Sequence, residues 1–151
     1  YGPAVRPLLA DREVIPLLKS GEPAPKLWIE YVPAKYQEQV LSAFDRQAAI
    51  AVKLNNTTTV YRYWGDKAFE SGSPWYTLDP SLEPSVARSL LALPEGNSAV
   101  HVSQFAVPAN TVIVLGKAAS QVKGFGSYAT GGGTQLYVPD PSIVTLIGRI
   151  R

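Results

Sequence analysis

VHVSQFAV-PAN-TVIVL, residues Val100–Leu115, is the stretch that decides the fold of this chain. Its two apolar runs are rich in β-branched residues, and the short Pro-Ala-Asn segment between them, Pro108–Asn110, is a turn signal. We therefore predict two antiparallel strands joined as a hairpin. Similar short runs follow the same pattern elsewhere in the second half of the chain: 60–64, 135–138 and 143–150, the last two separated by Pro139-Asp140-Pro141. The second half predicts a mostly antiparallel sheet in which these last two runs also pair.

The first half has a different periodicity. Lys35–Lys53 carries apolar residues at helical spacing and predicts the longest helix, which ends at Asn55–Thr58. Before it, Asp11 begins a shorter helical segment that Pro16 breaks into turns, and Gly21–Pro25 reads as a linker.

One further helix interrupts the strands. It begins near Ser81 or Pro84 and stops before Pro94. Helices followed by a mostly antiparallel sheet define an α+β fold. At 151 residues the chain fits one domain. We expect a helical N-terminal segment at 1–57 and a β-rich catalytic core at 58–151.

Composition excludes several classes of protein. The chain has no cysteine, so it has no disulfide, thiolate nucleophile or zinc–thiolate site. It has one histidine and shows no carboxylate cluster of ligand spacing, and we predict that it binds no metal. No apolar run reaches the length of a membrane span, and no signal peptide opens the chain. We therefore expect no stable membrane association.

The net charge of +2 is unevenly distributed. Residues 96–151 contain one acid, Asp140, and four basic residues, which are Lys117, Lys123, Arg149 and Arg151. This bias indicates an anionic ligand for the C-terminal part of the chain. It is too weak for a nucleic-acid surface, which needs clustered Lys and Arg and a higher pI. We expect no nucleic-acid partner.

Gly131-Gly132-Gly133-Thr134-Gln135 is the most unusual motif. Three glycines are needed where a ligand approaches the main chain closely, or where φ is positive more than once. Gln135 then opens a strand with an amide that both donates and accepts hydrogen bonds. The alternative is a flexible loop before an edge strand.

Two arginines are candidates for phosphate contacts. Arg62 lies within the aromatic run Tyr61–Trp64, where a bidentate guanidinium would sit beside rings that suit a flat base. Arg88 lies in an otherwise apolar stretch of the predicted helix. The alternatives are an edge-strand solubilising residue for Arg62 and a surface residue with a buried stem for Arg88.

Two further residues have both a structural and a functional interpretation. Thr77 follows Trp75-Tyr76 at a strand end, where it lines a ligand pocket or hydrogen-bonds its own turn. His101 is the single imidazole and lies between two valines. It is either a structural residue or a catalytic one.

The order of these motifs resembles the tuberculosis necrotizing toxin family of NAD glycohydrolases. It is also similar to ADP-ribosyl-cyclase-like C-terminal domains of bacterial polymorphic and contact-dependent-inhibition toxins. The resemblance covers roughly residues 58–140. It implies an ADP-ribosyltransferase-like sheet, NAD or NADP as the substrate, no added cofactor, and cleavage of the nicotinamide–ribose bond by hydrolysis or cyclisation.

The resemblance also implies roles for individual residues. Gln135, His101 and Arg62 would be catalytic, with Arg62 and Arg88 holding the dinucleotide phosphates. The remaining substrate-binding positions would be Trp75 or Trp64 near the nicotinamide, Thr77, Gly131, Gly132, Gly133 and Thr134. Enzymes of this kind that modify proteins carry a Glu-x-Glu motif at the strand of Gln135. Here the nearest acid to Gln135 is Asp140, so transfer to a protein acceptor is disfavoured.

A toxin of this type implies a cognate immunity protein. It also implies export as part of a larger toxin and action in the target-cell cytoplasm, and a chain that begins at Tyr1 fits an excised module. Two alternatives stay open. An RNase toxin would use His101 with Lys117 or Lys123, and a non-catalytic binding module would leave the glycine run purely structural.

Overall fold

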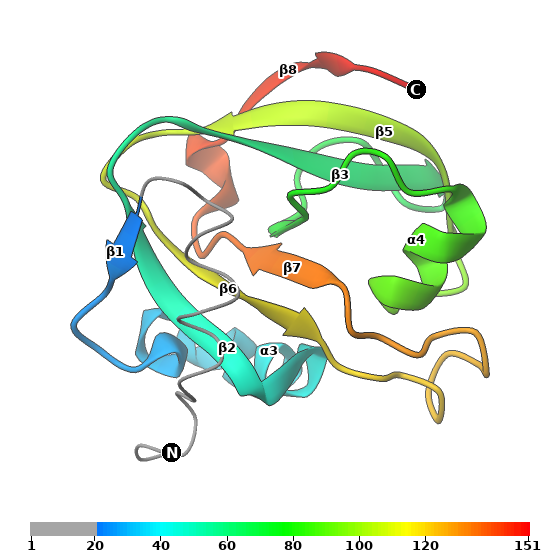
Figure 1. Cartoon of the computed structure of the whole chain (residues 1–151), viewed down its shortest axis with the longest axis horizontal. Coiled ribbons are helices and arrows are strands. Elements are labelled where there is room, and N and C mark those ends of the chain that lie inside the picture. The colour runs from blue at the N-terminus through cyan, green and yellow to red at the C-terminus, as the bar shows by residue number, and fades with distance from the viewer. Residues whose placement is uncertain (1–20) are drawn as a thin grey trace.

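The structure is a computed structural model that describes residues 21–151, and only the backbone of 46–48. It is an α+β fold of short helices and antiparallel strands arranged in two sheets, as expected (Figure 1). The helical segment predicted from Asp11 lies outside the described residues.

The larger sheet has the strand order β1-β2-β6-β7-β4, and every neighbouring pair is antiparallel. Its strands are β1 (Gly21–Pro23), β2 (Phe44–Leu54), β6 (Val112–Ala118), β7 (Thr134–Tyr137) and β4 (Trp75–Tyr76). The smaller sheet has the order β3-β5-β8 and consists of β3 (Thr58–Asp66), β5 (Asn97–Val107) and β8 (Thr145–Arg149). The helices are η2 (Trp28–Tyr31), η3 (Ala34–Tyr36), α3 (Gln37–Ala43), α4 (Pro84–Leu90) and η4 (Pro141–Ile143).

The strand positions predicted around Val100–Leu115 are right, but the hairpin is wrong. β5 pairs with β3 and β8, whereas β6 pairs with β2 and β7. The turn between them does not close a ladder, because Asn110 N donates to the Leu54 carbonyl at 2.7 Å and Leu54 N donates to the Thr111 carbonyl at 2.9 Å. The turn therefore carries the chain from the smaller sheet to the larger one. The predicted pairing of 135–138 with 143–150 is wrong for the same reason, since β7 and β8 lie in different sheets.

A core between the two sheets explains these pairings. Its buried residues come from both sheets: Ile50, Val52, Leu54, Val60, Tyr76, Phe105, Val107, Ile113, Leu115, Leu136 and Val138. Burying apolar area is the main favourable term in folding, and a flat hairpin of β5 and β6 would leave this surface in water. The chain therefore passes from one sheet to the other between β2 and β3 and again between β5 and β6, and the core lies between the two sheets.

The helix predicted over Lys35–Lys53 is only partly correct. Its first part forms η3 and α3, but residues 44–54 form strand β2. Ala49, Ile50, Ala51 and Val52 are all buried, because one face of β2 packs on the core between the sheets and the other under Trp28, Ile29 and Val40. A strand buried on both faces is a continuous apolar run, and such a run does not distinguish a strand from a buried helix.

The N-terminal segment is thus part of the sheet. β1 pairs with β2, so the first three residues of the predicted linker Gly21–Pro25 are an edge strand. At the other end of the molecule, α4 begins with Pro84 at its first turn, as predicted, and packs on the smaller sheet through Ala87 and Leu91. Figure 1 shows α3 beside the larger sheet and α4 beside the smaller one.

Candidate functional site

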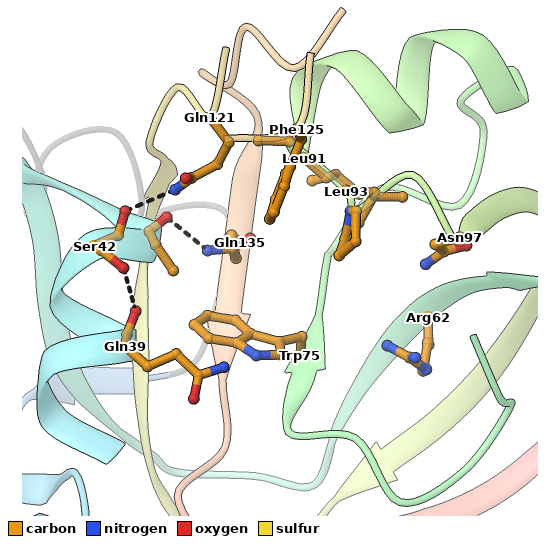
Figure 2. A pocket seen from close by; sticks show the side chains of 13 residues that line it. Gln39, Ser42, Arg62, Trp75, Leu91, Leu93, Asn97, Gln121, Phe125 and Gln135 are labelled. Carbon is orange, nitrogen blue, oxygen red and sulfur yellow. Dashed lines mark hydrogen bonds between the residues drawn. The ribbon is translucent and has the colours of Figure 1, made fainter. Parts of the chain in front are cut away.

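A cavity of about 250 Å³ lies where α3, α4 and strands of both sheets approach one another (Figure 2). It brings together three of the predicted site residues, Arg62 from β3, Trp75 from β4 and Gln135 from β7. The other lining residues are Gln39, Ser42, Ala43, Leu91, Ala92, Leu93, Pro94, Asn97, Gln121 and Phe125. A narrow hollow of about 30 Å³, which shares Arg62, Trp75 and Gln135 with this cavity, is also lined by Thr77. Within residues 21–151, neither space is lined by a carboxylate.

Gln135 presents an oriented amide. The side chain is 8% exposed, and its Nε2 donates to the carbonyl of Ala43, at the end of α3, at 3.1 Å. A backbone carbonyl accepts only, so this contact assigns the nitrogen to that side. Within the described part of the chain, Oε1 accepts no hydrogen bond. A buried acceptor of this kind calls for a donor, and a ligand hydroxyl in the cavity would provide one.

Among the residues that the structure describes, Arg62 is the one cationic residue that lines the cavity. Its Nε donates to the Phe69 carbonyl at 2.9 Å, and this is its only hydrogen bond to residues 21–151. Burial lowers the pKa of the guanidinium, and the neighbouring Tyr76 opposes that shift. Arginine nevertheless stays charged at neutral pH. The site therefore offers a partly desolvated positive charge, whose terminal nitrogens match an anion such as phosphate.

Trp75 forms a wall between this cavity and a second one. Its ring centroid lies 5.7 Å from that of Phe44 and 5.0 Å from that of Tyr137, so the indole is held by aromatic neighbours. The second cavity, of about 420 Å³, shares Trp75 and Gln39 with the first and is otherwise lined by Tyr36, Val40, Gly72, Pro74, Tyr137, Pro139 and Pro141. The indole thus borders both hollows.

Thr77 hydrogen-bonds within its own turn, one of its two predicted roles, and its hydroxyl also reaches a second strand. Its Oγ1 donates to the Thr134 carbonyl at 2.8 Å and accepts from Asp79 N at 3.5 Å. The residue also lines the narrow hollow beside Arg62. Its hydroxyl therefore ties β4 to the start of β7 and holds Trp75 and Gln135 on neighbouring strands.

The glycine run lies outside the cavity lining and serves the backbone. Gly131 and Gly132 have φ of +76° and +94°, so the expectation of repeated positive φ is confirmed. The close approach is to the chain itself: Gly131 N donates to Ser89 O and Gly133 N to Leu90 O, each at 2.9 Å. A Cβ at Gly131 would lie 2.5 Å from the Ala118 carbonyl oxygen. The backbone of the glycine run, directly before Gln135, is thus hydrogen-bonded to the last residues of α4.

Arg88 does not line the cavity. Its Nε donates to the Asn97 carbonyl at 3.1 Å, and its guanidinium lies 4.4 Å from the centre of the Tyr128 ring. The hydroxyl of Tyr128 in turn donates to the Leu93 carbonyl at 2.6 Å. The structure therefore uses Arg88 to hold the segment after α4 against the loop before β7.

His101 and Trp64 lie together in the smaller sheet and also do not line the cavity. They face each other across β3 and β5, with ring centroids 4.5 Å apart. The indole Nε1 of Trp64 donates to Ser103 Oγ at 2.9 Å. Lys117, one of the two lysines suggested as a partner of His101 in an RNase, lies on β6 in the larger sheet.

Sequence reasoning missed the wall that α3 provides. Gln39 and Ser42 line the cavity, and Gln121 Nε2 donates to the Ser42 carbonyl at 2.8 Å across it. Together with Ala119 N, which donates to the Ala43 carbonyl at 2.9 Å, these bonds satisfy carbonyls that a helix end leaves open. The available signal was the pair of polar residues, Gln39 and Ser42, three positions apart on a short helix, which places them on one face.

Two features are absent from residues 21–151. No three His, Cys, Asp or Glu side chains in this range are grouped closely enough to hold a metal ion. No helix in the same range has the length and apolarity that a membrane-spanning helix needs.

Comparison with known proteins gives a likeness of fold. No protein-family model matches the chain, and no curated protein is similar to it in sequence. A solved structure of Tse6 in complex with Tsi6 superposes on it with a TM-score of 0.54 and 17% sequence identity. The match covers 77% of this chain and 84% of that chain. The two proteins share an α+β fold.

Proposed function

We propose that this domain is a bacterial toxin that cleaves the nicotinamide–ribose bond of NAD or NADP, by hydrolysis or by cyclisation. The observation that carries the proposal is the cavity in which Arg62, Trp75 and Gln135 meet. The three side chains offer a guanidinium for phosphate, an aromatic face for a ring and an amide for the ribose hydroxyls.

The chemistry of the bond suits this set of side chains. Its cleavage releases neutral nicotinamide and leaves a ribose with oxocarbenium character, so the leaving group needs no general acid. The protein must hold the phosphates, orient the ribose and stabilise the developing positive charge. Arg62 supplies the first function and Gln135 Oε1, which faces no donor in the described chain, accepts from a ribose hydroxyl.

The indole of Trp75 would supply the third function. The negative face of an aromatic ring attracts cations, and this effect is strongest for tryptophan. The lack of a carboxylate among the lining residues fits a reaction whose acceptor is water or a group of the substrate itself. Transfer to a protein side chain, in enzymes that this chain resembles, uses acidic residues at this strand.

The toxin part of the proposal rests on two supports. The motifs resemble toxin domains, and the fold is similar to that of Tse6, which was solved in complex with a second protein, Tsi6. We propose by analogy that a small cognate immunity protein binds this domain and blocks the cavity. The domain would be exported within a larger toxin and would act in the target-cell cytoplasm.

Nucleotide chromatography tests the catalytic part. Purified domain is incubated with NAD and, separately, with NADP, and we expect release of nicotinamide from at least one of them. The second product, ADP-ribose or its cyclic form, distinguishes hydrolysis from cyclisation. Both dinucleotides surviving intact at micromolar protein would show that the proposal is wrong.

Growth of a bacterial host tests the partner. Expression of the domain should arrest growth, and co-expression of the gene immediately downstream in the source genome should restore it. A downstream product that neither restores growth nor forms a complex with the domain contradicts the toxin–immunity part alone.

A further inference from the structure

A hydrogen-bonded network of one buried and two half-buried side chains lies beside Arg62. The hydroxyl of Ser103, which is fully buried, donates to Glu70 Oε2 at 2.6 Å and accepts from Trp64 Nε1 at 2.9 Å. Ser103 is also the residue that faces Arg62 across β3 and β5. A buried hydroxyl is costly unless it is paired, and the Ser103 hydroxyl is paired both as a donor and as an acceptor.

The network holds the loop between β3 and β4, residues 67–74. Glu70 follows Phe69, whose carbonyl accepts the Nε hydrogen of Arg62 at 2.9 Å. The Phe69 ring is 77% exposed, so its packing does not fix this part of the loop. The hydrogen bond from Ser103 to Glu70 does, one residue away from the carbonyl that Arg62 uses.

The other hydrogen bonds of the loop lie at its two ends. At the beginning, Gly65 and Ala68 exchange two backbone hydrogen bonds of 3.1 Å, and Lys67 N donates to the Gly96 carbonyl at 2.9 Å. At the end, the Pro74 carbonyl accepts from Val138 N at 2.9 Å. Between the two ends, the loop is tied to the smaller sheet by Glu70 with Ser103 and by Phe69 with Arg62. Fixing Nε of a planar guanidinium also fixes the direction of its two terminal nitrogens, and the cavity is lined by this side chain.

We propose that Glu70, anchored by Ser103, is a positioning residue that orients Arg62 toward an anionic group in the cavity. The inference rests on the proposed function insofar as that anion is the diphosphate of a dinucleotide. The carboxylate of Glu70 would repel a bound anion, and a positioning role explains why an acid is nevertheless found near the site.

The direction in which anion affinity changes when Glu70 is removed distinguishes a positioning role from a purely electrostatic one. Removing a nearby carboxylate should strengthen anion binding if only Coulomb attraction matters. If Glu70 orients Arg62, its removal should weaken binding, because the guanidinium loses its fixed direction. The two mechanisms therefore predict opposite changes for the same substitution.

Inorganic pyrophosphate serves as a probe that needs no turnover. Its Kd is measured by calorimetry on wild type, Glu70→Ala, Ser103→Ala and a matched control, Asp66→Asn. Asp66 is an exposed acid in the same turn with φ of 55°, a conformation that asparagine tolerates. We expect Kd to rise about tenfold for the first two variants and to be unchanged for the control.

Kinetics with the dinucleotide give an independent measure. Glu70→Ala and Ser103→Ala should raise KM by about tenfold while kcat stays within about twofold, because each weakens binding in the ground state and transition state alike. In an Arg62→Lys background, Glu70→Ala should cause no additional loss, since both changes act on the same contact. A merely structural role would lower the Tm without this dependence on Arg62.

Glu70→Gln keeps an acceptor for Ser103 and provides a variant expected to fold if the alanine variants do not. It should lose binding by about threefold, since a neutral acceptor is roughly half as strong as a charged one. Unchanged or tighter pyrophosphate binding in any folded Glu70 variant overturns the inference, as does wild-type protein that binds no pyrophosphate. Network-dependent binding without cleavage of NAD or NADP contradicts the proposed function instead.

Discussion

Arg62 on β3 and Arg88 on α4 were both candidates for phosphate contacts, but they lie in two different regions of the structure. The guanidinium of Arg62 lines the cavity and makes one hydrogen bond within residues 21–151, to the Phe69 carbonyl. That of Arg88 lies over the Tyr128 ring and donates to the Asn97 carbonyl. Each side chain donates through Nε to one backbone carbonyl, so the two arginines differ in what lies beside their terminal nitrogens. Arg88 lies over a ring and supports the fold, whereas Arg62 lines a cavity and is available to a ligand.

The same contrast holds for other predicted residues. Gln135 and Trp75 line the cavity, and the Gln135 amide uses Nε2 for the Ala43 carbonyl. His101 and Trp64 lie on the smaller sheet, where each is the other's ring partner. The comparison teaches that residue type nominates candidates for the site, and that the position of each side chain relative to the cavity distinguishes among them.

The largest effect that we predict tests the cavity region. Gln135→Ala should lower kcat for the dinucleotide by about 100-fold or more, because a positioned ribose contact is lost in the transition state. Gln104→Ala, on β5 and outside the cavity lining, is the matched control. Turnover by chromatography and the fold by circular dichroism are measured in parallel, and full activity in a folded Gln135 variant contradicts the assignment.

Exchanging each arginine for lysine tests the comparison itself. Arg62→Lys should lower kcat/KM by about tenfold or more, because an ammonium group cannot reproduce the bidentate fork. Arg88→Lys should keep kcat/KM within about twofold and lower the free energy of unfolding by about 1 kcal/mol, through loss of its ring and carbonyl contacts. Both quantities are measured, by kinetics and by urea unfolding. A loss of activity in Arg88→Lys and a loss of stability alone in Arg62→Lys would contradict the assignment of Arg62 to the site and of Arg88 to the fold.

The glycine run offers a contrast within three residues. Gly131→Ala should lower the free energy of unfolding by about 3 kcal/mol, since a Cβ there meets the Ala118 carbonyl oxygen at 2.5 Å and φ is +76°. Gly132→Ala, at φ of +94° with no atom within 4 Å of the added Cβ, should cost about 1 kcal/mol. Equal losses in urea unfolding would mean that backbone conformation alone, without the contact to Ala118, sets the requirement.

The smallest effect concerns the smaller sheet. His101→Phe retains a ring against Trp64 and should leave kcat/KM within about twofold of wild type, because the imidazole is outside the cavity lining. The assay is the same nicotinamide release. A loss of tenfold or more in a variant of unchanged Tm would place His101 in catalysis, as the family resemblance implies.

Local sequence was enough to find most strands and helix α4. Val60–Trp64, Val100–Val107 and Gln135–Val138 are short β-branched and aromatic runs whose pattern depends on near neighbours, and each lies largely within a strand. Pro84 and Pro94 bracket α4 because proline acts on the backbone directly beside it. The residues Arg62, Trp75 and Gln135 were also recognisable, since the chemistry of a guanidinium, an indole or an amide belongs to the side chain itself.

The tertiary structure alone decided which strands pair and which candidates share a site. Residues 44–54 form a strand because segments far away in the chain bury both of its faces. β5 pairs with β3 instead of β6, and in this arrangement it covers the core from the opposite sheet. The α3 wall of the cavity and the separation of Arg62 from Arg88 followed from that packing. Burial and hydrogen-bond satisfaction sum over contacts between distant residues, whereas sequence patterns report only the preferences of near neighbours.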